Sequence, residues 1–224
     1  MDTSARRFDA VLFDLDGVLV DTEPWWDGVR VRFAAAHGRS WTAEDQAAVM
    51  GGNSLEWAAI MQARLDLPDL PLDVILDEVV DGVVGCYRDT VVLPVIGDAP
   101  AQVRRIAADR PVAIVSSGHH RIIEAAVDAL GLRGVLGAIV SSDDVPLGKP
   151  EPDVYLFAAS CLGVEPARCL VVEDSINGVR AGKSAGMTVV LVPNPTVPPA
   201  GEAWNLADVI VDSLAALDPD RLPV

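Results

Sequence analysis

Short apolar runs alternate along most of the chain with longer stretches of helical periodicity. The runs are rich in β-branched residues and end at polar side chains, which is typical of buried strands. We expect six such strands, at residues 10–13, 112–115, 135–140, 169–172, 188–192 and 209–211. The intervening spacing predicts helices at residues 101–109, 121–130, 153–162 and 176–185. Strands that alternate with helices predict an α/β fold built on a doubly wound parallel sheet, with helices on both faces.

Residues 23–92 do not follow this alternation of strands and helices. They contain no convincing strand, and their spacing predicts helices at 30–37, 43–50, 55–65 and 72–88. A helical block of this length directly after the first strand is better explained by a second, smaller domain than by a crossover connection. We therefore predict a core domain formed by residues 1–22 and 93–224, with a helical cap domain formed by residues 23–92. The Pro-rich stretch 193–199 is expected to be a loop after the fifth strand.

Charge and composition narrow the classes of function. The chain has 33 acidic and 17 basic residues, a formal net charge of −16, and half of its residues are hydrophobic. A folded core is therefore expected, while nucleic acid and anionic membranes are disfavoured as partners because both are polyanions. No apolar run reaches the roughly 20 residues of a spanning helix. The three cysteines show no metal-binding spacing, so we expect a reducing compartment, the cytoplasm. We also expect a monomer.

Two aspartates, Asp14 and Asp16, follow the first predicted strand two positions apart. In an extended chain such positions project to the same face, and ligands of open α/β sheets bind at the carboxyl ends of the strands. Neighbouring carboxylates repel unless a divalent cation neutralises them or one keeps a proton. Gly17 then lets the chain turn sharply. An acidic loop without function is the plain alternative, but four apolar residues precede Asp14 and place it at the edge of the core.

Further polar groups follow later strands of the same predicted sheet. They are Ser116, Ser117 and Gly118 after the second strand, Lys149 in a Gly- and Pro-containing loop, and Glu173 with Asp174 after the fourth strand. Each group alone has an ordinary explanation as a helix cap or a solvated loop residue. Together at one sheet edge, they provide a carboxylate nucleophile, an acid/base neighbour, phosphate-binding donors and oxygen ligands for Mg²⁺. That combination indicates a phosphoryl-transfer site.

The same motifs, in the same order, resemble those of the haloacid dehalogenase-like superfamily, in the subgroup with a helical cap inserted after the first motif. The matching stretches are DLDGVLVDTE, VSSG, GKPEPDVY and VVEDSINGV, and the resemblance covers residues 8–212. Within this superfamily the chain is similar to sugar- and polyol-phosphate phosphatases and, less closely, to β-phosphoglucomutase. The string DTEPWWD is similar to the DSEPLW start of phosphatases for hexitol, glycerol or deoxysugar phosphates.

This resemblance implies a role for each catalytic residue. Asp14 would attack phosphorus and become an aspartyl phosphate. Asp16 would protonate the leaving alcohol and then take a proton from the hydrolytic water. Ser116 and Lys149 would hold the phosphoryl oxygens.

A magnesium site is implied in the same way. The carboxylates of Asp14 and Asp174 and the main-chain oxygen of Asp16 would bind Mg²⁺, with Glu173 ligating directly or through water. Asp21 and Asn177 would support these groups. The candidates for substrate binding are Ser116, Ser117, Gly118 and Lys149 in the core and Glu23, Trp26, Gly52 and Asn53 in the cap, with His119 and His120 near the entrance.

A sugar-phosphate mutase is the first alternative. β-Phosphoglucomutases carry a histidine at the position of Trp26 and a cap arginine in a Gly-x-x-Arg pattern, where this chain has Leu55. Both departures disfavour mutase activity. A phosphonate hydrolase would need a cap lysine, and residues 23–92 contain none. A haloacid dehalogenase would lack the second aspartate of the Asp14–Asp16 pair.

A receiver-like signalling domain is the alternative that is not an enzyme. It would also use strand-end aspartates, Mg²⁺ and a lysine, but the helical insert and the position of Asp16 argue against it. We therefore expect a Mg²⁺-dependent phosphatase acting on a small phosphorylated metabolite, a sugar or polyol phosphate.

Overall fold

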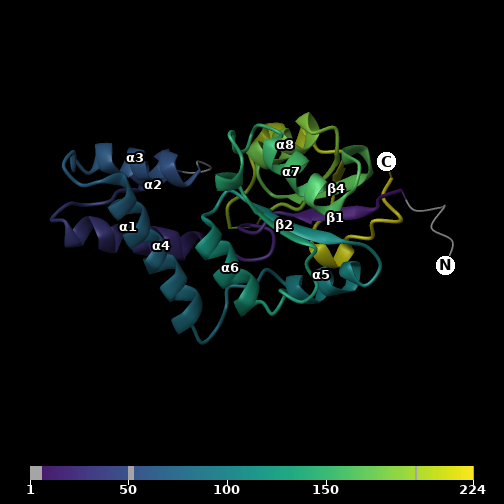
Figure 1. Ribbon diagram of the computed structural model, residues 1–224, viewed down its shortest axis with the longest axis horizontal. Coiled ribbons are helices and arrows are strands. Elements are labelled where there is room, and N and C mark those ends of the chain that lie inside the picture. The colour runs from purple at the N-terminus through teal and green to yellow at the C-terminus, as the bar shows by residue number, and fades with distance from the viewer. Residues whose placement is uncertain (1–6, 50–52, 195, 224) are drawn as a thin grey trace.

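A computed structural model describes residues 7–49, 53–194 and 196–223. One sheet of six parallel strands forms its centre, in the order β3–β2–β1–β4–β5–β6 (Figure 1). The strands are β1 (Ala10–Phe13), β2 (Val112–Ser116), β3 (Ala138–Ser141), β4 (Cys169–Glu173), β5 (Thr188–Leu191) and β6 (Val209–Ile210).

The central strands are apolar at nearly every position because helices cover both faces of the sheet. Every residue of β1 is buried, and Leu12 lies in register with Ala113 on one side and Val171 on the other. Alternate side chains of β1 pack on opposite faces of the sheet. Val11 and Phe13 join the apolar cluster on one face of the sheet, whereas Leu12 joins the cluster on the other face.

Helices lie on the two faces of the sheet as separate layers (Figure 1). One layer contains α5 (Ala99–Ala107) and α6 (His120–Ala129). The other contains α7 (Asp153–Leu162) and α8 (Ile176–Ser184), with α9 (Gly201–Leu206) packed on α8. Three short 3-10 turns complete the α/β part: η2 (Ser142–Asp144), η3 (Pro166–Arg168) and η4 (Leu214–Ala216).

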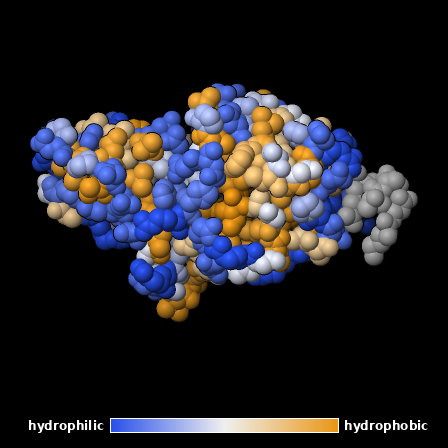
Figure 2. All heavy atoms as spheres, viewed as in Figure 1, coloured by the Kyte–Doolittle hydropathy of each residue, from blue (hydrophilic) through white to orange (hydrophobic). Residues whose placement is uncertain are grey.

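A block of four helices lies beside the α/β part, at the left of Figure 1. It comprises α1 (Glu23–Ala36), α2 (Ala43–Ala48), α3 (Ser54–Arg64) and α4 (Leu72–Asp89). Ile75, Val79 and Val83 recur on one buried face of α4, the spacing of an amphipathic helix. A Cβ on Gly82 would lie 2.7 Å from Val29, so α4 and α1 pack closely. On the face shown in Figure 2, hydrophilic side chains cover much of this block.

The α/β fold class with a doubly wound parallel sheet is confirmed, but some element boundaries differ. The first helix of the insert begins at Glu23 and not at residue 30, because Pro24 is well suited to the first helical turn. The third strand begins at Ala138 and not at residue 135. Helix α9 was not predicted, and the helix predicted at 43–50 ends at Ala48, with Met50 outside the described residues. The division into core and cap domains stays a prediction.

Within the described residues, no helix is both long enough and apolar enough to cross a membrane.

Truncating the centre of the sheet should unfold the protein more easily. Leu12 is fully buried on the middle strand, so Leu12→Ala should lower the free energy of unfolding by about 2–5 kcal/mol. Val31 is 42% exposed on α1, and Val31→Ala should change that free energy by no more than about 0.5 kcal/mol. Urea denaturation of both variants would measure the difference, and equal effects would contradict the placement of β1.

Candidate active site

The direction of winding reverses at β1, which lies between β2 and β4. The chain continues from β1 through β2 and β3 on one side and then crosses over to β4, β5 and β6 on the other. In such sheets a crevice forms at the carboxyl ends of the strands where the order reverses. A cavity of about 340 Å³ lies there, walled by residues of the strand ends and of helices α1 and α3.

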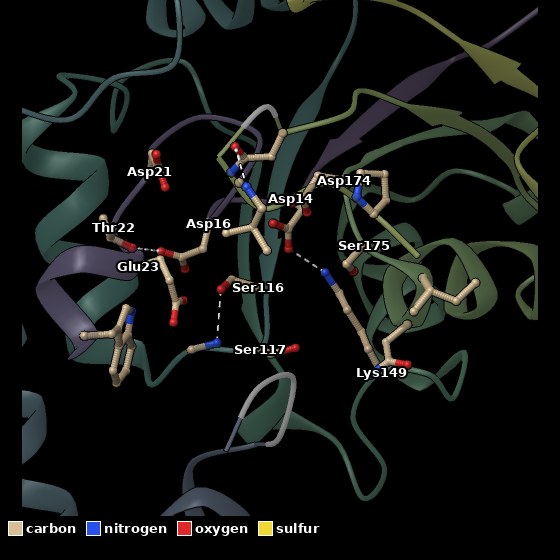
Figure 3. A pocket seen from close by; sticks show the side chains of 18 of the residues that line it. Asp14, Asp16, Asp21, Thr22, Glu23, Ser116, Ser117, Lys149, Asp174 and Ser175 are labelled. Carbon is tan, nitrogen blue, oxygen red and sulfur yellow. Dashed lines mark hydrogen bonds and ion pairs between the residues drawn. The ribbon is translucent and has the colours of Figure 1, made fainter. Parts of the chain in front are cut away.

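Most of the residues predicted from the sequence line this cavity, and Figure 3 shows many of them pointing into it. Those in the α/β part are Asp14, Asp16, Asp21, Ser116, Ser117, Gly118, Lys149, Asp174 and Asn177, and those on α1 are Glu23 and Trp26.

Lys149 is buried between two carboxylates. Its Nζ donates to Asp14 Oδ1 at 2.6 Å, to Glu173 Oε1 at 2.6 Å and to the main-chain oxygen of Val115 at 3.1 Å. Burial alone would lower the pKa of Lys149, but the charges of Asp14 and Glu173 raise it well above its ordinary value. The lysine is therefore a fixed cation at the end of β1, next to β2 and β4.

Glu173 is fully buried, and both of its oxygens accept hydrogen bonds. Oε1 accepts from Lys149 and from the hydroxyl of Tyr155 at 2.8 Å. Oε2 accepts from the main-chain nitrogens of Asp174 at 3.0 Å and Ser175 at 3.1 Å, and from the Ser175 hydroxyl at 3.0 Å. These five hydrogen bonds fix the Glu173 carboxylate and orient the residues that donate to it.

Asp14 and Asp174 carry the remaining carboxylates of the cluster. Carboxylate oxygens of Asp14, Glu173 and Asp174 lie within 4.8 Å of one another, a separation compatible with a metal ion. Burial and the nearby Glu173 charge raise the pKa of Asp14 to about 8, against the opposing effect of Lys149, and burial raises that of Asp174 to about 9. Hard oxygen ligands in this number could hold Mg²⁺, which would relieve the repulsion.

Asp16 lies apart from this cluster. The hydroxyl of Thr22 donates to Asp16 Oδ1, as the dashed line in Figure 3 marks. Burial raises the pKa of Asp16, although the hydrogen bond from Thr22 acts in the opposite direction. A carboxyl group with a raised pKa keeps its proton nearer to neutral pH, which suits a general acid.

The last residue of β2, Ser116, carries a hydroxyl that the following loop holds in place. The main-chain nitrogen of Gly118 donates to Ser116 Oγ at 3.0 Å, and the Ser141 hydroxyl donates to the main-chain oxygen of Gly118 at 2.7 Å. Because Ser116 Oγ accepts this bond from the loop, its own hydrogen can be donated to an anion in the cavity.

A family model described as haloacid dehalogenase-like hydrolase matches residues 8–186. The chain belongs to this family. It is thus a hydrolase, and the family predicted from the sequence motifs is confirmed.

Relatives of this hydrolase cover nearly its whole length. It is 29% identical over 222 residues to hexitol phosphatase B of Escherichia coli, with 96% of each chain covered. It is 32% identical over 188 residues to the fructose-1-phosphate phosphatase of the same organism, with 83% of this chain and 96% of that protein covered. A bifunctional riboflavin kinase/FMN phosphatase of Arabidopsis thaliana is 31% identical over 96% of this chain, which spans 56% of that longer protein.

Among solved structures, CbbY from Rhodobacter sphaeroides in complex with phosphate superposes with a TM-score of 0.78. It is 28% identical, and the match covers 94% of this chain and 96% of that one. The arrangement of sheet and helical insert therefore recurs in this structure.

Several residues predicted to bind substrate lie elsewhere in this hydrolase. Asn53 caps α3, where its side chain accepts from Glu56 N at 3.0 Å, and it is not among the residues that line the cavity. Neither His119 nor His120 lines it. His119 caps α6, and His120 Nε2 lies 2.6 Å from Asp144 Oδ1. Gly52 falls outside the described residues.

Other parts of the cavity wall were not predicted from the sequence. Arg30 and Trp57 line it, as do Asn194 and residues 197–200. Arg30 could have been found from its spacing, because positions 23, 26 and 30 lie on one face of a helix. Starting the predicted helix at residue 30 hid this relation.

Magnesium should stabilise the protein more at high pH than at low pH. Without metal, the raised pKa values of Asp14 and Asp174 mean that the folded state binds more protons than the unfolded state, from about pH 4 up to about pH 8–9. Stability should therefore fall as pH rises through this range. A cation replaces those protons, so the increase in melting temperature on adding MgCl₂ should be larger near pH 9 than near pH 6.

Melting curves with MgCl₂ and with EDTA would measure this effect. Asp174→Asn should remove most of the magnesium-dependent increase, while Glu151→Gln, an exposed neighbour of Lys149 in sequence, should retain it. An increase that is equal at the two pH values, or that survives in Asp174→Asn, would contradict binding at this cluster.

Proposed function

We propose that this hydrolase removes phosphate from a small sugar or polyol phosphate, with Mg²⁺ as cofactor and Asp14 as nucleophile. The observation that carries the proposal is the buried Lys149–Asp14 pair, which fixes a carboxylate beside Asp174 at the floor of the cavity. The cavity, at about 340 Å³, lies in the size range of sites for small ligands.

In the first half-reaction, a carboxylate oxygen of Asp14 attacks phosphorus. A phosphorus–oxygen bond to Asp14 forms, the bond to the leaving alcohol breaks, and an aspartyl phosphate results. Lys149 and the Ser116 hydroxyl donate to the phosphoryl oxygens and stabilise their charge. Because Lys149 is held by Glu173, it needs little reorganisation during the transfer.

Asp16 moves the proton in both half-reactions. In the first it protonates the leaving oxygen, which is consistent with its raised pKa. In the second it accepts a proton from the water that attacks phosphorus, and the phosphorus–oxygen bond to Asp14 breaks. The products are inorganic phosphate, the free alcohol and the regenerated Asp14 carboxylate.

We propose that Asp14, Asp174 and the main-chain oxygen of Asp16 hold Mg²⁺. Glu173 would act through Lys149 and not as a direct ligand, because both of its oxygens already accept hydrogen bonds from the protein. When bound, the cation neutralises charge on the carboxylates and on the phosphoryl group.

The substrate class rests on the relatives. Hexitol and fructose-1-phosphate phosphatases match over most of this chain, which supports a sugar or polyol phosphate. The mutase alternative is less well supported, because Trp26 lines the cavity where mutases carry a histidine. Leu55, at the position of the cap arginine, is 63% exposed and is not among the lining residues.

Two substitutions should separate the roles of the paired aspartates. Asp14→Asn should abolish phosphate release from sugar and polyol phosphates, because an amide cannot act as the nucleophile. Asp16→Asn should lower kcat by about 10²- to 10⁴-fold, the usual contribution of general acid–base catalysis, and should keep the magnesium-dependent rise in melting temperature. Phosphate release assayed with MgCl₂ and with EDTA would measure both effects.

The exposed Glu151→Gln variant serves as the control and should retain wild-type turnover. Substantial turnover by Asp14→Asn would refute the nucleophile assignment. Conversion of β-glucose 1-phosphate into the 6-phosphate, without accumulation of inorganic phosphate, would favour the mutase. A stable phosphorylated aspartate without any turnover would favour the receiver-like domain.

A further inference from the structure

Arg30 is a buried cation that forms no hydrogen bond or ion pair with the residues the structure describes. It lies on α1, lines the cavity and is only 5% exposed. Among the described residues, none forms a hydrogen bond or an ion pair with it, and its Nε is buried without an acceptor. Burial lowers the pKa of Arg30 to about 10, so it remains charged at neutral pH. Burying a guanidinium without acceptors is unfavourable, which indicates that something else supplies them.

Two tryptophans fix the position of Arg30. Its guanidinium carbon lies 4.8 Å from the ring centroid of Trp26 and 5.9 Å from that of Trp57, and the two indoles contact each other edge to face. Stacking on aromatic faces stabilises the cation but satisfies none of its N–H donors. The donors are thus held in place in the cavity wall.

Glu23 is fixed on the same face of α1, seven residues earlier. Its Oε1 accepts from Gln46 Nε2 at 2.6 Å, and Gln46 Oε1 in turn accepts from Trp41 Nε1 at 2.9 Å. Figure 3 shows the Glu23 carboxylate in the same space as Asp16 and Ser116. The helix therefore presents an acceptor near the phosphoryl site and a donor group two turns further on.

We propose that Arg30 and Glu23 form the subsite that recognises the leaving group, and that Arg30 selects polyhydroxylated alcohols by donating to their hydroxyl oxygens. This inference rests on the proposed phosphatase function. A hydroxyl group both donates and accepts, so a chain of hydroxyls satisfies Glu23 and Arg30 together. The positive charge of Arg30 and the negative charge of Glu23 cancel. Because Asp21 also lines the cavity, a second phosphate on the substrate would meet carboxylates as well as the arginine.

The test compares two esters of the same carbon chain, a hexitol 6-phosphate and n-hexyl phosphate, which lacks the hydroxyls. Arg30→Met keeps an unbranched apolar stem in place of the arginine stem and removes the guanidinium donors. This variant should lower kcat/KM for the hexitol phosphate by roughly 10- to 100-fold, mainly by raising KM. The loss of kcat/KM for the hexitol phosphate should be at least about tenfold larger than the loss for hexyl phosphate. Arg32→Met, on the exposed side of the same helix, is the matched control and should leave the ratio between the two substrates at its wild-type value.

An equal loss of kcat/KM for both esters would overturn the inference, because it would mean that Arg30 only stabilises the helical block. A hexitol bisphosphate that the wild type hydrolyses better than the monophosphate, with the preference lost in Arg30→Met, would also overturn it by identifying an anion as the ligand. Arg30→Lys keeps the charge without the planar donor fork, and an intermediate loss specific to the hexitol phosphate would support the inference even if Arg30→Met failed to fold.

Calorimetric titration with the hexitol phosphate separates this inference from the proposed function. Absence of phosphate release from every ester, with binding that Arg30→Met still weakens at least about tenfold, would refute the phosphatase and support the subsite. Hydrolysis of both esters, with hexitol binding that Arg30→Met leaves unchanged, would refute the subsite alone.

Discussion

One buried ammonium group links three neighbouring strands at the edge of the sheet where the candidate active site lies. Lys149 Nζ bonds to residues that follow or belong to three neighbouring strands: Asp14 after β1, Val115 in β2 and Glu173 in β4. Nζ also lies 5.0 Å from the centroid of the Tyr155 ring, which belongs to α7. A buried cation of this kind is tolerated only with its partners in place, since removing one leaves the others uncompensated. The strand order and the charge cluster therefore depend on each other.

Close packing around the carboxylates explains two glycines of the sequence motifs. A Cβ on Gly17 would lie 2.0 Å from Asp174 Oδ2, and a Cβ on Gly178 would lie 1.6 Å from Glu173 Oε1. Gly17 also has a φ of +96°, which side chains other than glycine rarely adopt. These positions bring α8 and the turn after β1 against the acidic residues, so the strand-end carboxylates stay close to one another despite their repulsion.

The α/β architecture could be predicted because local pattern and topology agree: the carboxyl ends of parallel strands share one edge, so Asp14, Ser116 and Asp174 had to be neighbours. Details that depend on distances between elements could not. The saturation of Glu173 by five donors follows from α7 and α8 meeting at β4. An asparagine side chain such as that of Asn53 can bind a ligand or cap a helix. In the structure Asn53 caps α3.

In the proposed mechanism, helix α1 takes part both in proton transfer and in recognition of the leaving group. Thr22 donates to Asp16 and is also the N-cap residue of α1. The first residue of the helix, Glu23, lines the cavity. In the proposed mechanism, one continuous segment would thus carry the nucleophile, the acid and the wall that meets the leaving group. The N-cap residue of the helix that carries Arg30 also holds Asp16, the proposed proton donor. A substrate that fits against this face of α1 would therefore meet an acid held by the same helix, so that selection of the alcohol and its protonation would depend on one element.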